Sequence, residues 1–160
     1  MLDRKLLRIY LNDHLGGSAA GLALARRCLR ANRGTELGAF LEGLTAEIEE
    51  DKYTLVRLMV RLGFKRSAAK QMAGLAAERL GRLKLNGQLT GYSDLSRLLE
   101  LEGLTIGIRG KHALWANLRA AGIQEHVPDI ALDRLIERAE SQLSGLEPHR
   151  LAAAATALKN

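Results

Sequence analysis

His14 and Asp51 are the residues of this 160-residue chain whose types and positions first suggest chemistry. Each is a polar interruption in a largely apolar row whose members recur every three or four positions, the spacing of one helix face. If the chain reverses at Arg33 and Gly34, the two residues lie at nearly equal sequence distances from the turn. Antiparallel packing then brings an imidazole and a carboxylate together inside a helical core. The two rows are Leu7, Leu11, His14, Ser18, Gly21, Ala25 and Cys28, and Leu37, Leu41, Leu44, Ile48, Asp51, Leu55, Leu58 and Leu62.

Four more carboxylates lie on or beside the expected apolar faces and could converge on the same region. They are Glu47 and Glu50 before Asp51, Glu102 in the row Leu95, Leu99 and Ile106, and Glu140 beside Ile136 and Leu143. Unpaired buried charges are costly, so such residues persist in a core only if they pair, take up protons or bind a cation. Because imidazole and carboxylate ligands suit iron, manganese or zinc, one hypothesis is a metal or small-ligand site in the bundle core. Its candidate residues are His14, Glu47, Glu50, Asp51, Glu102 and Glu140.

Two other interpretations stay open. In the first, His14 and Asp51 only hydrogen-bond each other, while the glutamates reach solvent or pair with Arg109 or Lys111. In the second, the chain is a non-catalytic interaction module that binds a protein partner, a second copy of itself or, weakly, nucleic acid. The sequence assigns no enzyme class, because it contains no nucleophile elbow and no phosphate-binding loop.

The composition indicates a single all-α domain over residues 1–160. Apolar residues make up 47% of the chain, charged residues 26%, and proline occurs only twice, a balance that favours helix over sheet. No stretch approaches the roughly 18 consecutive apolar residues that span a bilayer. The opening segment MLDRKLLRIYLNDH has Asp and Arg where a signal peptide needs apolar residues. We therefore expect a cytoplasmic protein without a membrane span.

The formal net charge of +6 raises the question of nucleic-acid binding, since clustered Lys and Arg side chains bind phosphate backbones. The cations gather instead at the ends of predicted helices, where they complement the negative end of the helix dipole. They are Arg26, Arg27, Arg30 and Arg33 in one segment and Arg57, Arg61, Lys65 and Arg66 in another. We therefore do not expect nucleic acid to be a partner, whereas a homo-oligomer is compatible with the sequence.

Two single residues are expected in the core without a chemical role. Cys28 is the only cysteine, so it forms no intrachain disulfide, and its place in the first apolar row predicts a buried small hydrophobe. Trp115 shares a helix face with Ile108 and Leu118 and is expected to pack as an ordinary core residue.

Four glycines divide the chain into five predicted helices. Gly34, Gly63, Gly87 and Gly122 each follow a periodic segment, as expected of residues that close a helix in the left-handed conformation. The helices run from about Asp3 to Asn32, from after Thr35 to Gly63, from near Ser67 to Asn86, from near Ser93 to Ala121, and from near Asp129 onward, with a kink at Pro148. Four are long and the third is shorter. A short helix that crosses between two long hairpins predicts a four-helix bundle with one long connection.

This layout, with inward polar residues at mid-height, resembles the ferritin-like superfamily over nearly the whole chain. The second helix of that family typically carries Glu-x-x-His. The segment from Ala46 to Tyr53 is similar, with Glu47 matching the first ligand and Glu50 standing where the histidine would be.

The other ligand positions of the family match this sequence less closely. The first-helix ligand falls near Asp13 or His14, and Glu100-Leu101-Glu102 can supply the third carboxylate. The last predicted helix has no Glu-x-x-His, because Glu147-Pro148-His149 has a different spacing. The resemblance therefore implies a ferritin-like scaffold whose metal site is lost or remodelled.

Glycines also recur inside two of the predicted helices. They are Gly16, Gly17 and Gly21 in the first, and Gly103, Gly107 and Gly110 in the fourth. Each costs about 1 kcal/mol of helix propensity relative to alanine, so something should compensate. We expect close contact with another helix, or a bound ligand, to do so.

Overall fold

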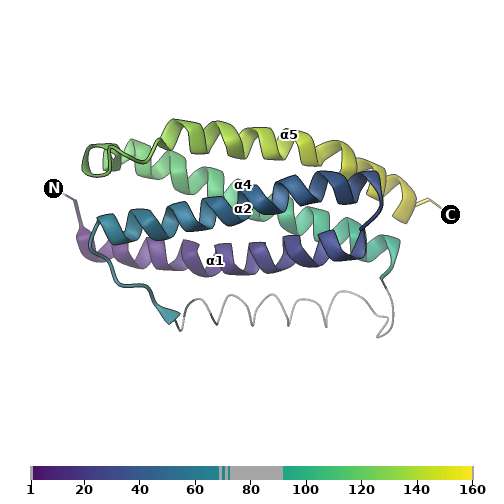
Figure 1. Ribbon diagram of the computed structural model, residues 1–160, viewed down its shortest axis with the longest axis horizontal. Coiled ribbons are helices and arrows are strands. Elements are labelled where there is room, and N and C mark those ends of the chain that lie inside the picture. The colour runs from purple at the N-terminus through teal and green to yellow at the C-terminus, as the bar shows by residue number, and fades with distance from the viewer. Residues whose placement is uncertain (1, 69, 71, 73–91, 160) are drawn as a thin grey trace.

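A computed structural model describes residues 2–68, 70, 72 and 92–159 of the chain. Within these residues the chain forms four α-helices and one 3-10 helix. They are α1 (Arg4–Ala31), α2 (Glu36–Arg61), α4 (Asp94–Ala120), η1 (Ile123–His126) and α5 (Leu132–Ala157). The described residues contain no strand, and the long helices pack side by side (Figure 1). The predicted all-α bundle is confirmed. The predicted helix between Ser67 and Asn86 falls largely on residues 69, 71 and 73–91, outside the described residues.

The helices begin and end at residues that suit those positions. Asp3, Thr35 and Ser93 cap α1, α2 and α4, because each side chain accepts a hydrogen bond from a backbone N–H of the first turn. Of the four glycines predicted to close helices, Gly34, Gly63 and Gly122 have positive φ, as predicted, and Gly87 lies outside the described residues.

The predicted start of the last helix is wrong. α5 begins at Leu132 rather than Asp129, because the preceding residues form a turn in which the N–H of Ile130 donates to the carbonyl of Val127. Both of these side chains are buried in the core, so the turn is anchored by packing that no local sequence pattern reports. Pro148 lies inside α5, which continues to Ala157.

Contacts between the helices fix their directions. The start of α1 lies beside the end of α2, where Arg4 donates to the carbonyl of Leu62 at 2.7 Å. It also lies beside the end of α4, where Asn117 donates to the hydroxyl of Tyr10 at 3.0 Å. α1 is therefore antiparallel to both α2 and α4, and α5 is antiparallel to its neighbour α4 (Figure 1).

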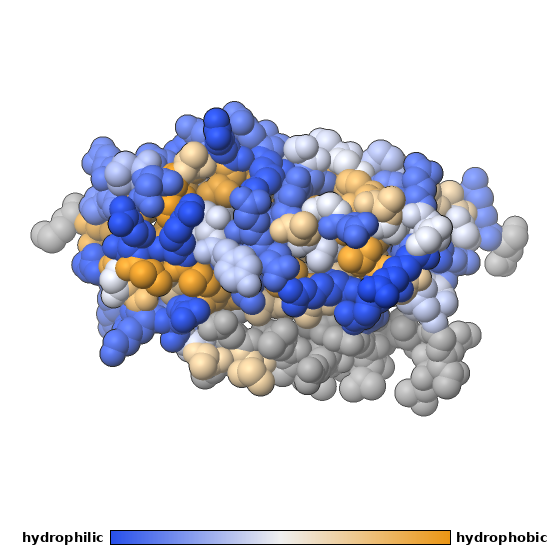
Figure 2. All heavy atoms as spheres, viewed as in Figure 1, coloured by the Kyte–Doolittle hydropathy of each residue, from blue (hydrophilic) through white to orange (hydrophobic). Residues whose placement is uncertain are grey.

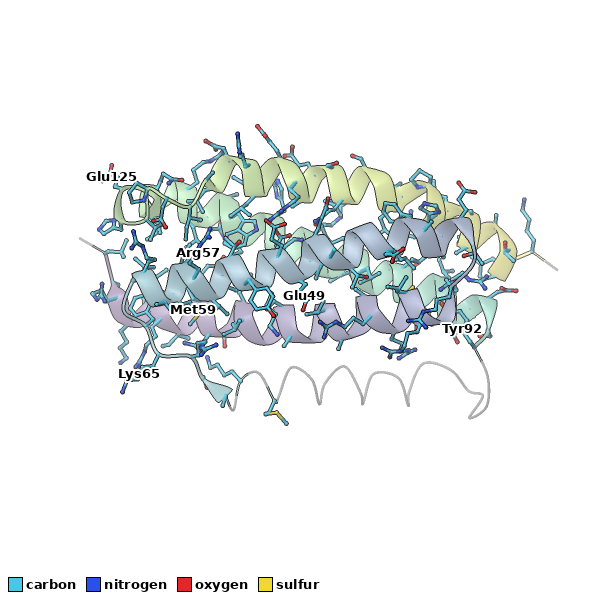
Figure 3. The ribbon with its side chains drawn as sticks, viewed as in Figure 1. Glu49, Arg57, Met59, Lys65, Tyr92 and Glu125 are labelled. Atoms are coloured by element: carbon cyan, nitrogen blue, oxygen red, sulfur yellow. The ribbon has the colours of Figure 1, made fainter. Side chains whose placement is uncertain are left out.

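It follows that α2 and α4 run in the same direction. The chain leaves α2 at one end of the bundle and enters α4 at the other, and Lys65 and Tyr92 mark these two ends (Figure 3). The order of directions along the bundle is up, down, down, up.

The core consists of two clusters of buried apolar side chains. One lies toward the start of α1 and includes Leu11, Leu15, Leu58, Met59, Trp115, Leu118, Ile123 and Leu132. The other lies toward the end of α1 and includes Leu22, Ala25, Leu41, Leu44, Leu101, Leu104, Ala139 and Leu146. Polar residues occupy the level between the clusters, which is where the candidate site lies.

Two of the predicted helix faces differ from those in the structure. On α1, Leu15 and Leu22 are buried, whereas His14 of the predicted row is only half-buried. On α4, the row predicted to carry Glu102 inward lies at the surface, since the neighbouring Ile106 is 73% exposed. The inward direction of Glu102 was therefore a wrong prediction, because the buried face of α4 is the one that carries Leu98, Leu101 and Leu104.

The described residues include no helix with the length and apolar character that crossing a bilayer requires. Hydrophilic side chains cover much of the face seen in Figure 2, with smaller apolar areas between them. Several cations near helix ends are paired, for example Arg26 with Glu49 and Arg61 with Asp129.

Candidate small-molecule site in the bundle core

A cavity of about 200 Å³ lies at mid-height, between α1, α2 and α4. Its wall is mainly apolar and combines side chains from both core clusters with glycines and a few polar groups. The lining residues are His14, Gly17, Ser18 and Gly21 of α1, Ile48, Asp51, Lys52 and Leu55 of α2, and Leu104, Gly107, Ile108, Gly110, Lys111, Leu114 and Trp115 of α4. His14 and Asp51, which were predicted to meet, thus line the same cavity from α1 and α2.

The glycines of this wall have open space beside them, and because Gly17 and Gly107 are exposed, the cavity opens to the surface. A Cβ atom built on Gly17, Gly21, Gly107 or Gly110 would meet no other atom within 4 Å. Two other helical glycines are packing contacts, since a Cβ on Gly103 would lie 2.9 Å from Leu24 and one on Gly145 would lie 2.9 Å from Phe40. The expectation of close helix contact is therefore confirmed at Gly103 and wrong at the four cavity glycines.

Asp51 is held by two cations. Its side chain is 2% exposed, Lys111 of α4 donates to its Oδ2 at 2.5 Å, and Arg138 of α5 pairs with its Oδ1. Gln142 of α5 accepts from the Lys111 ammonium at 2.5 Å. Burial lowers the pKa of Lys111, whereas the carboxylate of Asp51 acts in the opposite direction. The pair therefore compensates a buried charge that would otherwise be costly.

Two of the predicted carboxylates lie at the outer edge of this network. Glu50 pairs with Arg138 at 2.9 Å, and Glu47 accepts from the amide of Gln142 at 2.8 Å. The structure therefore brings Glu47, Glu50 and Asp51 together through residues of α5.

His14 lines the cavity from α1 and makes no hydrogen bond to this network among the described residues. It is half-buried, and its ring packs edge-on against Tyr10 with the ring centroids 4.6 Å apart. Burial lowers its pKa, and the nearby Asp13 carboxylate opposes that shift. In the described part of the chain no hydrogen bond joins His14 to Asp51, because the oxygens of Asp51 accept from Lys111, Arg138 and Gln142.

The remaining candidate carboxylates lie away from the network. Glu140 is exposed and lies 3.2 Å from His112, and Glu102 is partly exposed on α4. Nowhere in the described residues do three or more His, Cys, Asp or Glu side chains gather as metal ligands would. The donor set also does not suit iron, manganese or zinc, since Asp51 is already neutralised by Lys111 and Arg138.

Trp115 and Lys52 line the cavity, and both side chains carry hydrogen-bond donors. Trp115 is 1% exposed, as predicted for a core residue, and its indole N–H has no partner among the described residues. Lys52 makes no hydrogen bond or ion pair with another described residue. A buried indole N–H without an acceptor is unusual, because leaving it unpaired costs free energy.

Sequence reasoning missed Arg138, Gln142 and the donor role of Trp115, and it named Lys111 only as a partner for a glutamate. The one available signal was Lys111 itself, a cation within a glycine-rich and apolar stretch of α4. No pattern within α5 could show that Arg138 and Gln142 face α2, because that depends on how the helices pack.

A second buried carboxylate, Glu100, lies where α1 ends and α4 begins. It pairs with Arg27 and accepts a hydrogen bond from the hydroxyl of Tyr92 at 3.0 Å, and Tyr92 in turn accepts from the amide of Asn32 at 2.9 Å. Cys28 is fully buried beside this group, as predicted, and burial raises the pKa of its thiol to about 12. The thiol therefore stays protonated, and the group serves to join α1 to α4.

No protein-family model matches the chain, and neither a curated protein nor a solved structure matches it significantly.

Proposed function

We propose that this chain is a ferritin-like helical bundle that binds a small, largely apolar molecule in the cavity at its centre. The observation that carries the proposal is a mainly apolar cavity, open to the surface, whose lining includes four helical glycines without close neighbours, Gly17, Gly21, Gly107 and Gly110. Neither helix approaches these glycines closely enough to explain them.

The four cavity glycines lower the stability of their helices. Each glycine in a helix interior costs about 1 kcal/mol relative to alanine, and two of these glycines lie in α1 and two in α4. A close helix contact would offset that cost, as it does at Gly103. At the cavity, contact with a bound molecule would offset it instead.

The size of the cavity limits the ligand. An engineered apolar cavity of about 150 Å³ in another protein binds benzene, so a space of about 200 Å³ accommodates a molecule of about one ring with a small substituent. Nucleotides and long acyl chains are too large. The mainly apolar wall suits a ligand with an apolar body, and the few polar groups would orient it.

The ferritin-like part of the proposal is supported by the directions of the helices. An up, down, down, up bundle with one long connection between two parallel helices is the arrangement of ferritin-like folds. In such bundles, ligand and metal sites lie between facing helices at mid-height, which is where this cavity lies.

The test is binding of toluene, a neutral molecule of the right size, followed by NMR shifts of the core methyl groups of Ile48 and Ile108. We expect saturable binding to the natural chain. Gly21→Leu should abolish it, because the new side chain fills the cavity, whereas Gly43→Leu should not. Gly43 is a matched control, because it is an exposed helical glycine with open space around it and does not line the cavity.

Three results would contradict the proposal. One is the absence of saturable toluene binding to a folded natural chain, which would favour the interaction module instead. Another is unchanged binding by a folded Gly21→Leu variant. The third is a rise in melting temperature with Fe(II), Mn(II) or Zn(II) that Asp51→Asn removes, which would favour a metal site.

A further inference from the structure

We propose that the natural ligand is a small organic acid whose apolar body lies against the glycines and whose carboxylate faces the hydrogen-bond donors of the cavity. This inference rests on the proposed function, since it concerns the same cavity. It adds the chemical class of the ligand's polar group.

Donors and acceptors around the cavity differ in how far partners satisfy them. The carboxylate oxygens of Asp51 already accept from Lys111, Arg138 and Gln142, whereas two donors of the lining lack a partner in the described part of the chain. The indole N–H of Trp115 has no partner among the described residues, and Lys52 has no ion-pair partner there. A ligand that satisfies this wall must therefore bring acceptors.

The cavity lining carries more positive than negative charge. Lys52 and Lys111 line the cavity against a single carboxylate, Asp51, and Arg138 also pairs with that carboxylate. The lining therefore carries an excess of positive charge. A carboxylate entering this space gains charge-assisted hydrogen bonds, whereas an ammonium group meets like charge and a carboxylate that is already paired.

The hydrogen-bond donors of the cavity lining come from different helices. Lys52 lies on α2, Trp115 on α4 and His14 on α1, so they surround the cavity instead of forming one exposed patch. Trp115 in particular is almost completely buried, so its N–H cannot obtain a partner from bulk water. Polar groups from several helices around one cavity are what a specific small-molecule site requires.

The experiment compares three probes with the same ring at pH 7.5: benzoate, toluene and benzylamine, which is a cation at this pH. We expect benzoate to bind the natural chain at least about tenfold more tightly than toluene, the factor expected of a hydrogen bond to a charged group. Benzylamine should show no saturable binding. NMR shifts of the core methyl groups report all three.

Two variants locate the interaction. Lys52→Met and Trp115→Phe should each weaken benzoate binding about tenfold and leave toluene binding unchanged, because each removes a donor and keeps an apolar side chain. Lys65→Met is the control, since Lys65 is an exposed lysine near the end of α2 and outside the cavity (Figure 3). It should leave both affinities unchanged.

The outcomes separate the two proposals. If toluene and benzoate bind equally and Gly21→Leu abolishes the binding of both, the cavity binds small molecules, but the proposal that its ligand is an organic acid is contradicted. If benzylamine binds more tightly than benzoate, the acid is likewise overturned. If none of the probes binds a folded natural chain, both the acid and the proposed function fail.

Discussion

Polar residues in this core differ in how fully their partners satisfy them. Asp51 has both oxygens occupied by cations, whereas His14 borders the cavity with an aromatic contact and without a hydrogen bond to Asp51. Burial is the main influence on the pKa of His14 and lowers it, whereas the Asp13 carboxylate acts in the opposite direction.

This difference predicts a dependence of stability on pH. Burial lowers the pKa of folded His14 below its ordinary value of 6.5, so the unfolded chain takes up this proton first as the pH falls. The contribution of His14 to stability is therefore lost as the pH falls from about 6.5 to below the folded pKa. His14→Gln should reduce the loss of unfolding free energy between pH 7.5 and pH 5, as measured by urea denaturation.

His126→Gln is the control, because His126 is exposed in η1 and does not border the cavity. It should keep the natural pH dependence. Equal pH dependence of the natural chain and His14→Gln would mean that His14 titrates alike in the folded and unfolded states, and the assignment of a buried neutral imidazole would be wrong.

The sequence predicted which polar residues of the first two helices would share a space, but not what would neutralise them. Periodicity within a helix reports the side that is apolar, and it was sufficient for Asp51 because six leucines and an isoleucine flank it in its row. The periodicity of α5 does not show which of its side chains face α2. The contacts of Arg138 and Gln142 with Asp51 therefore became evident only from the packing of the helices.

At the scale of the helices, short-range signals were reliable and rotational details were not. Capping side chains and left-handed glycines act within a few residues, so they fixed the ends of α1 and α2 and the start of α4. The inward rotation of α4 depends on packing against α1 and α5, and the prediction for Glu102 failed there. The role of a helical glycine could not be predicted for the same reason, because a glycine in a packing contact and a glycine beside a cavity have the same sequence pattern.

Two alanine substitutions test the distinction between open and crowded glycines. Gly107→Ala should raise the unfolding free energy by about 0.5–1 kcal/mol, because it adds helix propensity and its Cβ meets nothing within 4 Å. Gly38→Ala should lower it by roughly 1–3 kcal/mol, because its Cβ would lie 2.1 Å from the carbonyl oxygen of Asn32. Thermal and urea denaturation of the two variants measure both changes. A destabilised Gly107→Ala would show that the space beside α4 is filled in the folded chain.

At the scale of the whole molecule, the bundle is two apolar cores joined by a polar layer. Leu55, Leu114 and Trp115 on the cavity wall belong to one cluster, and Ile48, Leu104 and Ile108 belong to the other. A molecule bound in the cavity would contact both clusters. The layer formed by Asp51, Lys111, Arg138 and Gln142 thus interrupts a core that apolar side chains could otherwise fill continuously.

This arrangement predicts that the layer reduces stability. Replacing buried ion pairs with apolar residues of similar size often raises stability by roughly 1–4 kcal/mol, so the triple variant Asp51→Leu, Lys111→Met, Arg138→Met, which removes the carboxylate and both of its cations, should be more stable than the natural chain. Lys111→Met alone should lower the unfolding free energy by roughly 1–3 kcal/mol, since Asp51 loses one of its two cations. Urea denaturation followed by the fluorescence of Trp115, the single tryptophan, measures both. A triple variant less stable than Lys111→Met would show that the layer itself holds the two cores together, and its polar residues would then need no functional explanation.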